Sequence, residues 1–149
     1  MKPTKLSLSI EAPIEKVFAV IADVEGFLEV VPEIVKVEFL SEQRSGVGTR
    51  FRETRMMGKR EGATVLELTE CVENDHVRFV SDAGGTIWDT VFTVRNVSEG
   101  VVELTLVMEV RAYKLLSKLL NPLVMPMVRK AMAKDMEAIK NFCEGDSSN

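Results

Sequence analysis

The sequence predicts an α+β fold in which a curved, seven-stranded antiparallel sheet wraps around one long C-terminal helix, with two short helices after the first strand. Two observations support this fold. Apolar runs of strand type, separated by turn residues, fill the chain from about 34 to 111. A helical period returns after Tyr113 and lasts to Cys143. A lone amphipathic helix needs an apolar surface to cover, and a sheet with one apolar face provides it.

The first 32 residues predict one strand and two short helices. The strand is indicated by three apolar residues that alternate with polar ones: Leu6, Leu8 and Ile10. From Pro13 the period becomes helical, and proline suits a first helical turn because its missing N–H would be unpaired there. This helix is expected to end near Asp23, which then caps a second short helix that Pro32 stops.

Six further strands are predicted at 34–42, 48–57, 62–72, 76–83, 86–96 and 100–111. A turn over 58–61 sets Phe51 opposite Leu68, which places two apolar side chains on one face. The dipeptide Gly84-Gly85 suits a two-residue primed turn. This turn pairs three sets of residues across its strands: Val77 with Phe92, Phe79 with Thr90, and Ser81 with Trp88. One concave apolar face results.

The last strand and the long helix complete the apolar interior. Four residues of the strand share its inner face: Val102, Leu104, Leu106 and Met108. The helix carries an apolar stripe of Met125, Val128, Met132, Met136, Ile139 and Cys143. The length of 149 residues suits a single domain over 1–149, with 145–149 as a frayed tail.

Composition excludes several classes of function. A formal net charge of −4 argues against nucleic acid as a partner, because phosphate contacts need a clustered excess of Lys and Arg. Two cysteines and the single His76 provide no metal-binding spacing, and no metal or cofactor is expected. The start MKPTKLSLSI lacks an apolar signal core, which predicts a cytoplasmic protein with free thiols. The apolar stretch 115–128 is interrupted by polar and proline residues, so no transmembrane segment is predicted.

Three phrases of the sequence resemble a known superfamily. They are IEAPIEKVFAVIADVEGFLEVVPEIVKVEFL, GVGTRFRETRMMGKR and LLSKLLNPLVMPMVRKAMAKDMEAIKNF. With the predicted order of elements, they resemble the START-like (SRPBCC, helix-grip) superfamily, and within it the polyketide cyclase/dehydrase type, over nearly the whole chain. The resemblance implies the helix-grip fold and a hydrophobic cavity. The superfamily includes lipid carriers, plant hormone-binding proteins, aromatic cyclases and chaperone-interacting domains, so the fold alone does not select a function.

The predicted cavity combines an apolar lining with few polar groups. Its expected residues are Phe51, Glu53, Arg55, Leu66, Phe79, Ser81, Trp88, Thr90, Phe92, Leu106, Met108, Met125 and Met132. Glu53 and Arg55 share the face of Phe51 because side chains two apart on a strand point the same way. They are the candidate catalytic residues: Arg55 can hold a ligand carboxylate or enolate, and Glu53 can act as a general base. The alternative is that they pair only with each other near the cavity mouth.

The segment between the last strand and the long helix is interpreted as a gate to the cavity. Its expected residues are Tyr113, Leu116, Leu119, Leu120 and Pro122. Pro122 and Pro126 should interrupt the helix, giving a short helix, a bend and then the long helix. The leucines would then cover the cavity mouth, with the proline bend as a hinge. The alternative is a rigid cap whose leucines complete the core.

We expect a non-catalytic protein that binds or carries a hydrophobic small molecule such as a lipid, isoprenoid or polyketide-like compound. The alternative is a cyclase or dehydratase that uses Glu53 or Arg55 in proton transfer. A third interpretation is a coenzyme Q-binding-like or protein-interaction module. Five cations near one hairpin suggest a transient contact with an anionic membrane. The alternative is a solvated hairpin face, because nearby glutamates offset much of the positive charge. The five cations are Arg50, Arg52, Arg55, Lys59 and Arg60.

Overall fold

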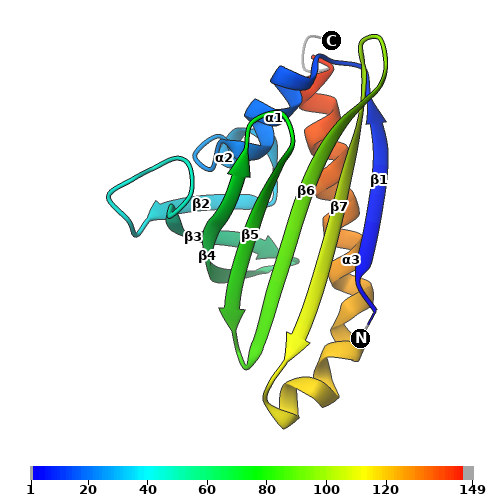
Figure 1. Cartoon of the computed structure of the whole chain (residues 1–149). Coiled ribbons are helices and arrows are strands. Elements are labelled where there is room, and N and C mark those ends of the chain that lie inside the picture. Colours follow the sequence, from blue (N-terminus) through cyan, green and yellow to red (C-terminus); the bar gives the residue numbers. More distant parts are fainter. Residues whose placement is uncertain (1, 146–149) are drawn as a thin grey trace.

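The computed structural model describes residues 2–145 and has the predicted fold (Figure 1). The elements follow the chain as β1 (Thr4–Ile10), α1 (Ile14–Ala22), α2 (Phe27–Val30), β2 (Ile34–Phe39), β3 (Arg50–Met57), β4 (Arg60–Val72), β5 (His76–Ala83), β6 (Thr86–Ser98), β7 (Val101–Ala112) and α3 (Leu115–Cys143). The seven strands form one antiparallel sheet in the order β1-β7-β6-β5-β4-β3-β2. Of the predicted frayed tail, residues 146–149 lie outside the described residues.

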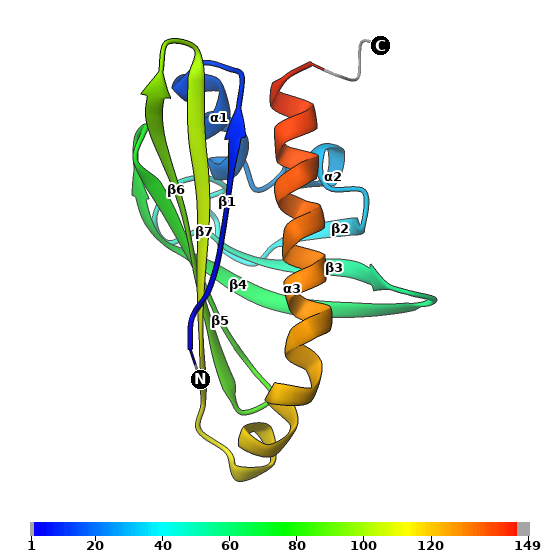
Figure 2. The ribbon, with the colours of Figure 1, turned by 90° about the vertical axis from the view of Figure 1, so that its right-hand side faces the viewer.

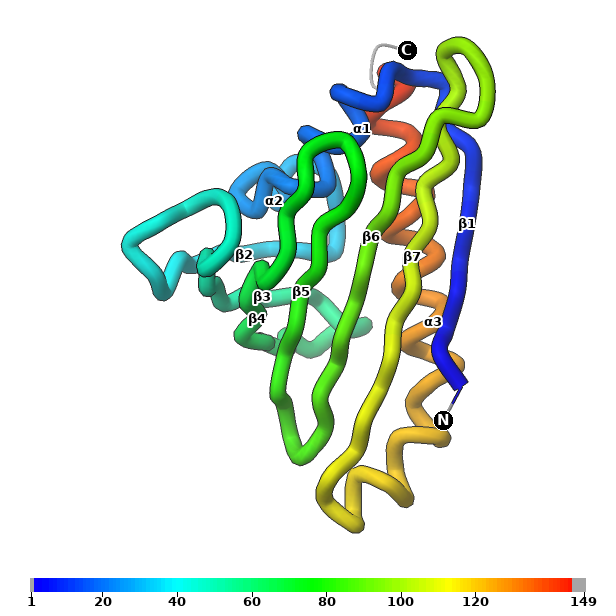
Figure 3. The backbone as a smooth tube through the Cα atoms, viewed as in Figure 1, coloured from blue at the N-terminus to red at the C-terminus, as the bar shows by residue number. Residues whose placement is uncertain are grey.

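The sheet is strongly curved around α3. In Figure 2, β3 and the part of β4 that pairs with it run across the direction of β6 and β7, and Figure 3 shows the rest of β4 running alongside β5. The two ends of the sheet therefore face different sides of the helix. Helices α1 and α2 connect β1 to β2 and lie at the end of the sheet where α3 finishes. The sheet, α1, α2 and α3 therefore surround a common interior.

The strand registers agree with expectation at one hairpin and differ at another. Between β5 and β6, Phe79 lies opposite Thr90 and Ser81 opposite Trp88, as predicted. Between β3 and β4, Phe51 lies opposite Leu66 and not Leu68, so the predicted register was wrong by two residues. The turn contains only Gly58 and Lys59, because Gly58 adopts a positive φ of 68° and permits a tight turn. A shift of two leaves every side chain on its predicted face.

The hydrophobic core lies where α1 and the second half of α3 meet the sheet. Ile10, Val17 and Leu104 are fully buried there. From α3, Met136 and Cys143 pack against the same cluster, as the predicted stripe requires. This packed end fixes the helix on the sheet, while the region toward β3 and β4 remains hollow.

Helix α3 continues through both prolines, contrary to the predicted interruption. It is one helix over Leu115–Cys143 with Pro122 and Pro126 inside it. Figure 2 shows that its first turns run at an angle to the rest. Each proline removes one N–H donor and crowds the preceding turn, so a change of direction without a break is the structural outcome. No helix in residues 2–145 is long and apolar enough to cross a membrane.

Candidate ligand-binding cavity

A cavity of about 540 Å³ lies between the sheet, the two short helices and α3. This volume is within the range of roughly 300–1,000 Å³ that is typical of small-molecule sites. Its sheet side includes Phe51, Leu66, Phe79, Ser81, Trp88, Thr90, Phe92 and Met108. Its helical side includes Val20, Ile21, Phe27, Val30 and Val31 from α1, α2 and the residue after α2, and Val128, Met132, Asp135 and Ile139 from α3. Most of this lining is apolar.

Phenylalanine rings form one wall of the cavity. Phe51 and Phe79 lie 6.0 Å apart between ring centroids with their planes nearly perpendicular, and Phe27 from α2 contacts both rings edge-on. Phe92 extends the row at 6.4 Å from Phe79. Edge-to-face packing holds aromatic rings in defined positions. The wall therefore offers a fixed surface for an apolar ligand.

A cluster of charged side chains lines another part of the same cavity. The Arg55 guanidinium donates two hydrogen bonds to the Asp135 carboxylate, from Nη1 to Oδ1 at 3.1 Å and from Nη2 to Oδ2 at 2.9 Å. Its Nε donates to Glu53 Oε2 at 3.4 Å. Glu33, at the edge of the cluster, lies 3.8 Å from Arg55. The guanidinium therefore lies within ion-pair distance of three carboxylates. Asp135 accepts the hydrogen bonds of both terminal nitrogens, which is the bidentate arrangement.

The cluster contains more negative than positive charge, and burial penalises the excess. Burial raises the pKa of Glu53, although the Arg55 charge opposes this change. Burial also raises the pKa of Asp135, again opposed by its hydrogen bonds to Arg55. The carboxylates outweigh burial at Arg55 and raise its pKa, so the guanidinium stays charged. The cavity therefore favours a proton or a positive charge beside Glu53 and disfavours another anion.

Ser81 supplies an unpaired polar group in the lining. Its side chain is buried, and its Oγ has no hydrogen-bond partner among the described residues. A buried hydroxyl without a partner costs free energy, so a ligand atom that forms a hydrogen bond with it would remove that cost. Ser81 lies directly across from Trp88, so the hydroxyl and the indole ring flank one part of the cavity.

Comparison with known proteins agrees with this architecture. Residues 3–142 match the family described as "Polyketide cyclase / dehydrase and lipid transport". The chain belongs to this family. Its fold is START-like. A search of curated proteins finds no match.

Solved structures similar to this family member share its fold at low sequence identity. The protein TTHA0849 from Thermus thermophilus is 18% identical, with a TM-score of 0.78 over 98% of this chain and 99% of that one. A START superfamily protein from Mycobacterium smegmatis is 18% identical, with a TM-score of 0.70 over 97% and 95% of the two chains. Truncated norcoclaurine synthase from Thalictrum flavum is 16% identical, with a TM-score of 0.74 over 95% and 92%.

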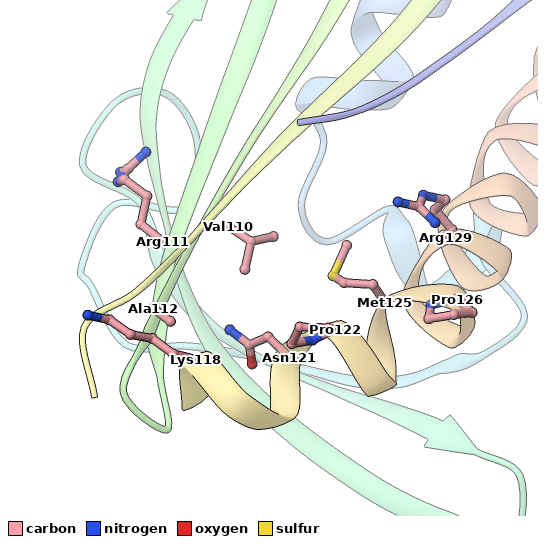
Figure 4. A pocket seen from close by; sticks show the side chains of 9 residues that line it. All are labelled: Val110, Arg111, Ala112, Lys118, Asn121, Pro122, Met125, Pro126 and Arg129. Carbon is pink, nitrogen blue, oxygen red and sulfur yellow. The ribbon is translucent and has the colours of Figure 1, made fainter. Parts of the chain in front are cut away.

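Two of the predicted cavity residues lie elsewhere in this family member. Leu106 does not line the cavity but is fully buried in the hydrophobic core, opposite Leu6 of β1 and Phe92 of β6. Met125 faces a second cavity of about 810 Å³ between the end of β7 and the first half of α3 (Figure 4). Three cations contribute to the lining of this second cavity: Arg111, Lys118 and Arg129.

The predicted gate is not supported by the positions of its residues. Tyr113, Leu116, Leu119, Leu120 and Pro122 do not line the cavity between sheet and α3. All five are exposed, and Pro122 borders the second cavity. Polar contacts attach this part of the chain to the sheet: the Tyr113 hydroxyl donates a hydrogen bond to Asp82 Oδ1 at 2.7 Å, and the buried Ser117 and Asn121 of α3 also bond to the sheet and its turn. The exposed leucines therefore neither cover the cavity mouth nor complete the core.

Asp135, which organises the charged cluster, was not predicted from the sequence. Its position did indicate an inward-facing side chain, because Asp135 is three residues after Met132 and four before Ile139 on the apolar stripe of the helix. An acidic residue on such a stripe needs a cation, and Arg55 was already predicted to face inward. The lining from α1 and α2 was not predicted, because helical periodicity identifies an apolar face but not what that face packs against.

Proposed function

We propose that this protein binds a hydrophobic small molecule in the cavity between the sheet and α3. The proposal rests mainly on one observation: an apolar, aromatic-walled cavity contains a buried hydroxyl, Ser81 Oγ, with no partner among the described residues. A ligand with an apolar body and one hydrogen-bonding group satisfies both features. The family description, which includes lipid transport, supports the same class of ligand.

The charged cluster restricts the polar end of the ligand. The terminal nitrogens of Arg55 are bonded to Asp135 and are not available to a ligand carboxylate. The role expected for Arg55 from the sequence, holding a ligand carboxylate or enolate, is therefore not part of this proposal. A ligand carboxylate would add a third negative charge near Glu53 and Asp135. We therefore expect a neutral hydroxyl or carbonyl, or a protonated amine, in preference to an acid.

Three compounds that share one ring system test this preference. Naphthalenemethanol and naphthalenemethylamine should bind at least about tenfold more tightly than naphthoic acid near neutral pH. The reason is that burying an unpaired carboxylate costs more free energy than one hydrogen bond contributes. The change Ser81→Ala should weaken the binding of naphthalenemethanol by roughly fivefold, which is the effect of one lost hydrogen bond. The affinity for naphthalene itself should not change. Isothermal titration measures each affinity. Tightest binding of the acid would refute the proposed polarity.

An enzyme of the cyclase or dehydratase type is the second candidate. The observation that favours it is Glu53, whose carboxyl lines the cavity and has a pKa raised by burial, as a general acid or base requires. Its hydrogen bond to Arg55 would hold the carboxyl in position. Incubating the protein with its isolated ligand distinguishes the two functions. A carrier returns the compound unchanged, whereas an enzyme returns a product and the Glu53→Gln variant retains binding but loses conversion.

A further inference from the structure

The first half of α3 has its polar and apolar faces reversed relative to the second half. Toward the sheet it presents Ser117, whose Oγ donates to the Gly84 carbonyl oxygen at 2.6 Å. One turn later the buried Asn121 donates from Nδ2 to Thr86 Oγ1 at 3.0 Å. In the second half, by contrast, the buried positions are mainly apolar. The first half is therefore held to the sheet by hydrogen bonds, and its apolar residues face away.

The outward face of this half is a continuous apolar surface, which we call the leucine face. It consists of Leu115, Leu116, Leu119, Leu120, Leu123, Val124 and Met127, all exposed. Leu115 and Leu123 are 73% and 76% exposed. These residues are spaced by one, three or four positions, so they share one side of the helix. Contiguous apolar surface of this kind on a folded protein indicates an interaction site, whereas single exposed leucines do not.

The charges carried by the helical segment of the leucine face are all positive. Residues 113–134 contain no Asp or Glu and five cations: Lys114, Lys118, Arg129, Lys130 and Lys134. The whole chain has a formal net charge of −4, so these five cations leave the remainder at −9. Lys134 lies 3.8 Å from Glu33, while the other four have no ion pair with any of residues 2–145. The cations are thus available to an external anionic partner.

We propose that the leucine face docks on an anionic lipid bilayer. Leucine on one side of a helix with Lys and Arg around it is the composition of helices that lie in the membrane interface. The long lysine and arginine side chains can reach lipid phosphates while the leucines enter the acyl region. A second copy of this chain fits less well, because a two-fold contact would bring five cations against five cations.

Docking in this way would bring the cavity close to the membrane. The bond from Ser117 to Gly84 ties the first turn of α3 to the turn between β5 and β6. Gly84 and the preceding Ala83 are exposed residues that line the cavity, so this turn forms part of its rim. A bilayer in contact with the leucine face therefore lies about one helix diameter, roughly 10 Å, from this part of the rim. The docking itself does not depend on what the cavity binds.

Vesicle flotation tests the docking. The full chain is mixed with vesicles of phosphatidylcholine alone, or with roughly a third phosphatidylserine, which supplies the negative surface. We expect the protein to float only with the anionic vesicles and to dissociate at high salt. The paired change Leu119→Gln and Leu123→Gln should weaken binding by at least about tenfold, because two leucines no longer enter the lipid. The paired change Lys118→Gln and Lys130→Gln should weaken it by about fivefold for each cation.

Matched controls are available on other exposed surfaces. Val72→Gln with Val97→Gln, and separately Lys5→Gln with Lys16→Gln, should leave flotation unchanged. The proposal is overturned if the native chain does not float, if it floats equally well with phosphatidylcholine alone, or if the controls lose binding as the leucine variant does. It is also overturned if the native chain does not bind vesicles but sedimentation shows a dimer, or a complex with an acidic protein, that the leucine variant abolishes. Binding of neutral N-phenylnaphthylamine to the same variants is a separate readout, so loss of docking is distinguished from loss of the cavity.

Discussion

Replacing Arg55 by Met should destabilise the protein by about 3–5 kcal/mol near neutral pH, which is the usual cost of removing one partner from a buried ion pair. Arg55 holds Asp135 through two hydrogen bonds and Glu53 through a third. Without the guanidinium, two carboxylates remain in the cavity with burial opposing their charge. Urea unfolding measures the loss, and Arg52→Met, on the same strand but directed outward, should change stability by less than about 1 kcal/mol.

The destabilisation should depend on pH in a defined direction. Burial already raises the pKa of Glu53 and of Asp135, and removal of Arg55 raises both further. In the Arg55→Met variant the folded state therefore takes up protons that the unfolded state does not. Its stability deficit should be largest at about pH 8 and should shrink as the pH falls toward the ordinary carboxyl values. A deficit that is constant or grows between about pH 8 and about pH 5 would show that the two carboxyls do not share Arg55 as described.

Replacing Leu106 by Ala should cost about 2–5 kcal/mol, whereas Leu119→Ala should change stability by no more than about 0.5 kcal/mol. Leu106 on β7 is fully buried in the hydrophobic core, so its truncation leaves a cavity. Leu119 is 65% exposed on the leucine face. The chemical change is identical in the two variants, so urea unfolding compares only their surroundings. Similar losses would mean that the leucine face is covered in the folded monomer.

Local signals explain why much of the fold could be predicted. Gly84-Gly85 permits a tight turn and thereby sets the register of β5 and β6, which was predicted correctly. At the turn between β3 and β4, loops of two and four residues place the same side chains inward. The apolar pattern cannot distinguish these two loops, so the register was missed although both Glu53 and Arg55 were assigned to the correct face.

The candidate site was harder to predict because its decisive contacts join distant parts of the chain. Arg55 and Asp135 are 80 positions apart, and only the curvature of the sheet around α3 brings them together. The leucine face shows a related limit. Periodicity identifies which residues share a side of a helix, but it does not say which side faces inward. Ser117 and Asn121 decide that question through hydrogen bonds that only the folded chain reveals.

The central claim, that the cavity binds an apolar molecule, is tested most directly by filling the cavity. Thr64 lines the cavity on β4 opposite Glu53, and Thr64→Trp places a large ring in the space a ligand would need. Fluorescence titration with neutral N-phenylnaphthylamine should show one site in the native protein and at least about tenfold weaker binding in the variant, since most of the buried apolar contact is lost. Circular dichroism verifies that the variant is folded. Equal affinity of the two proteins, or no binding to the native one, would contradict the account.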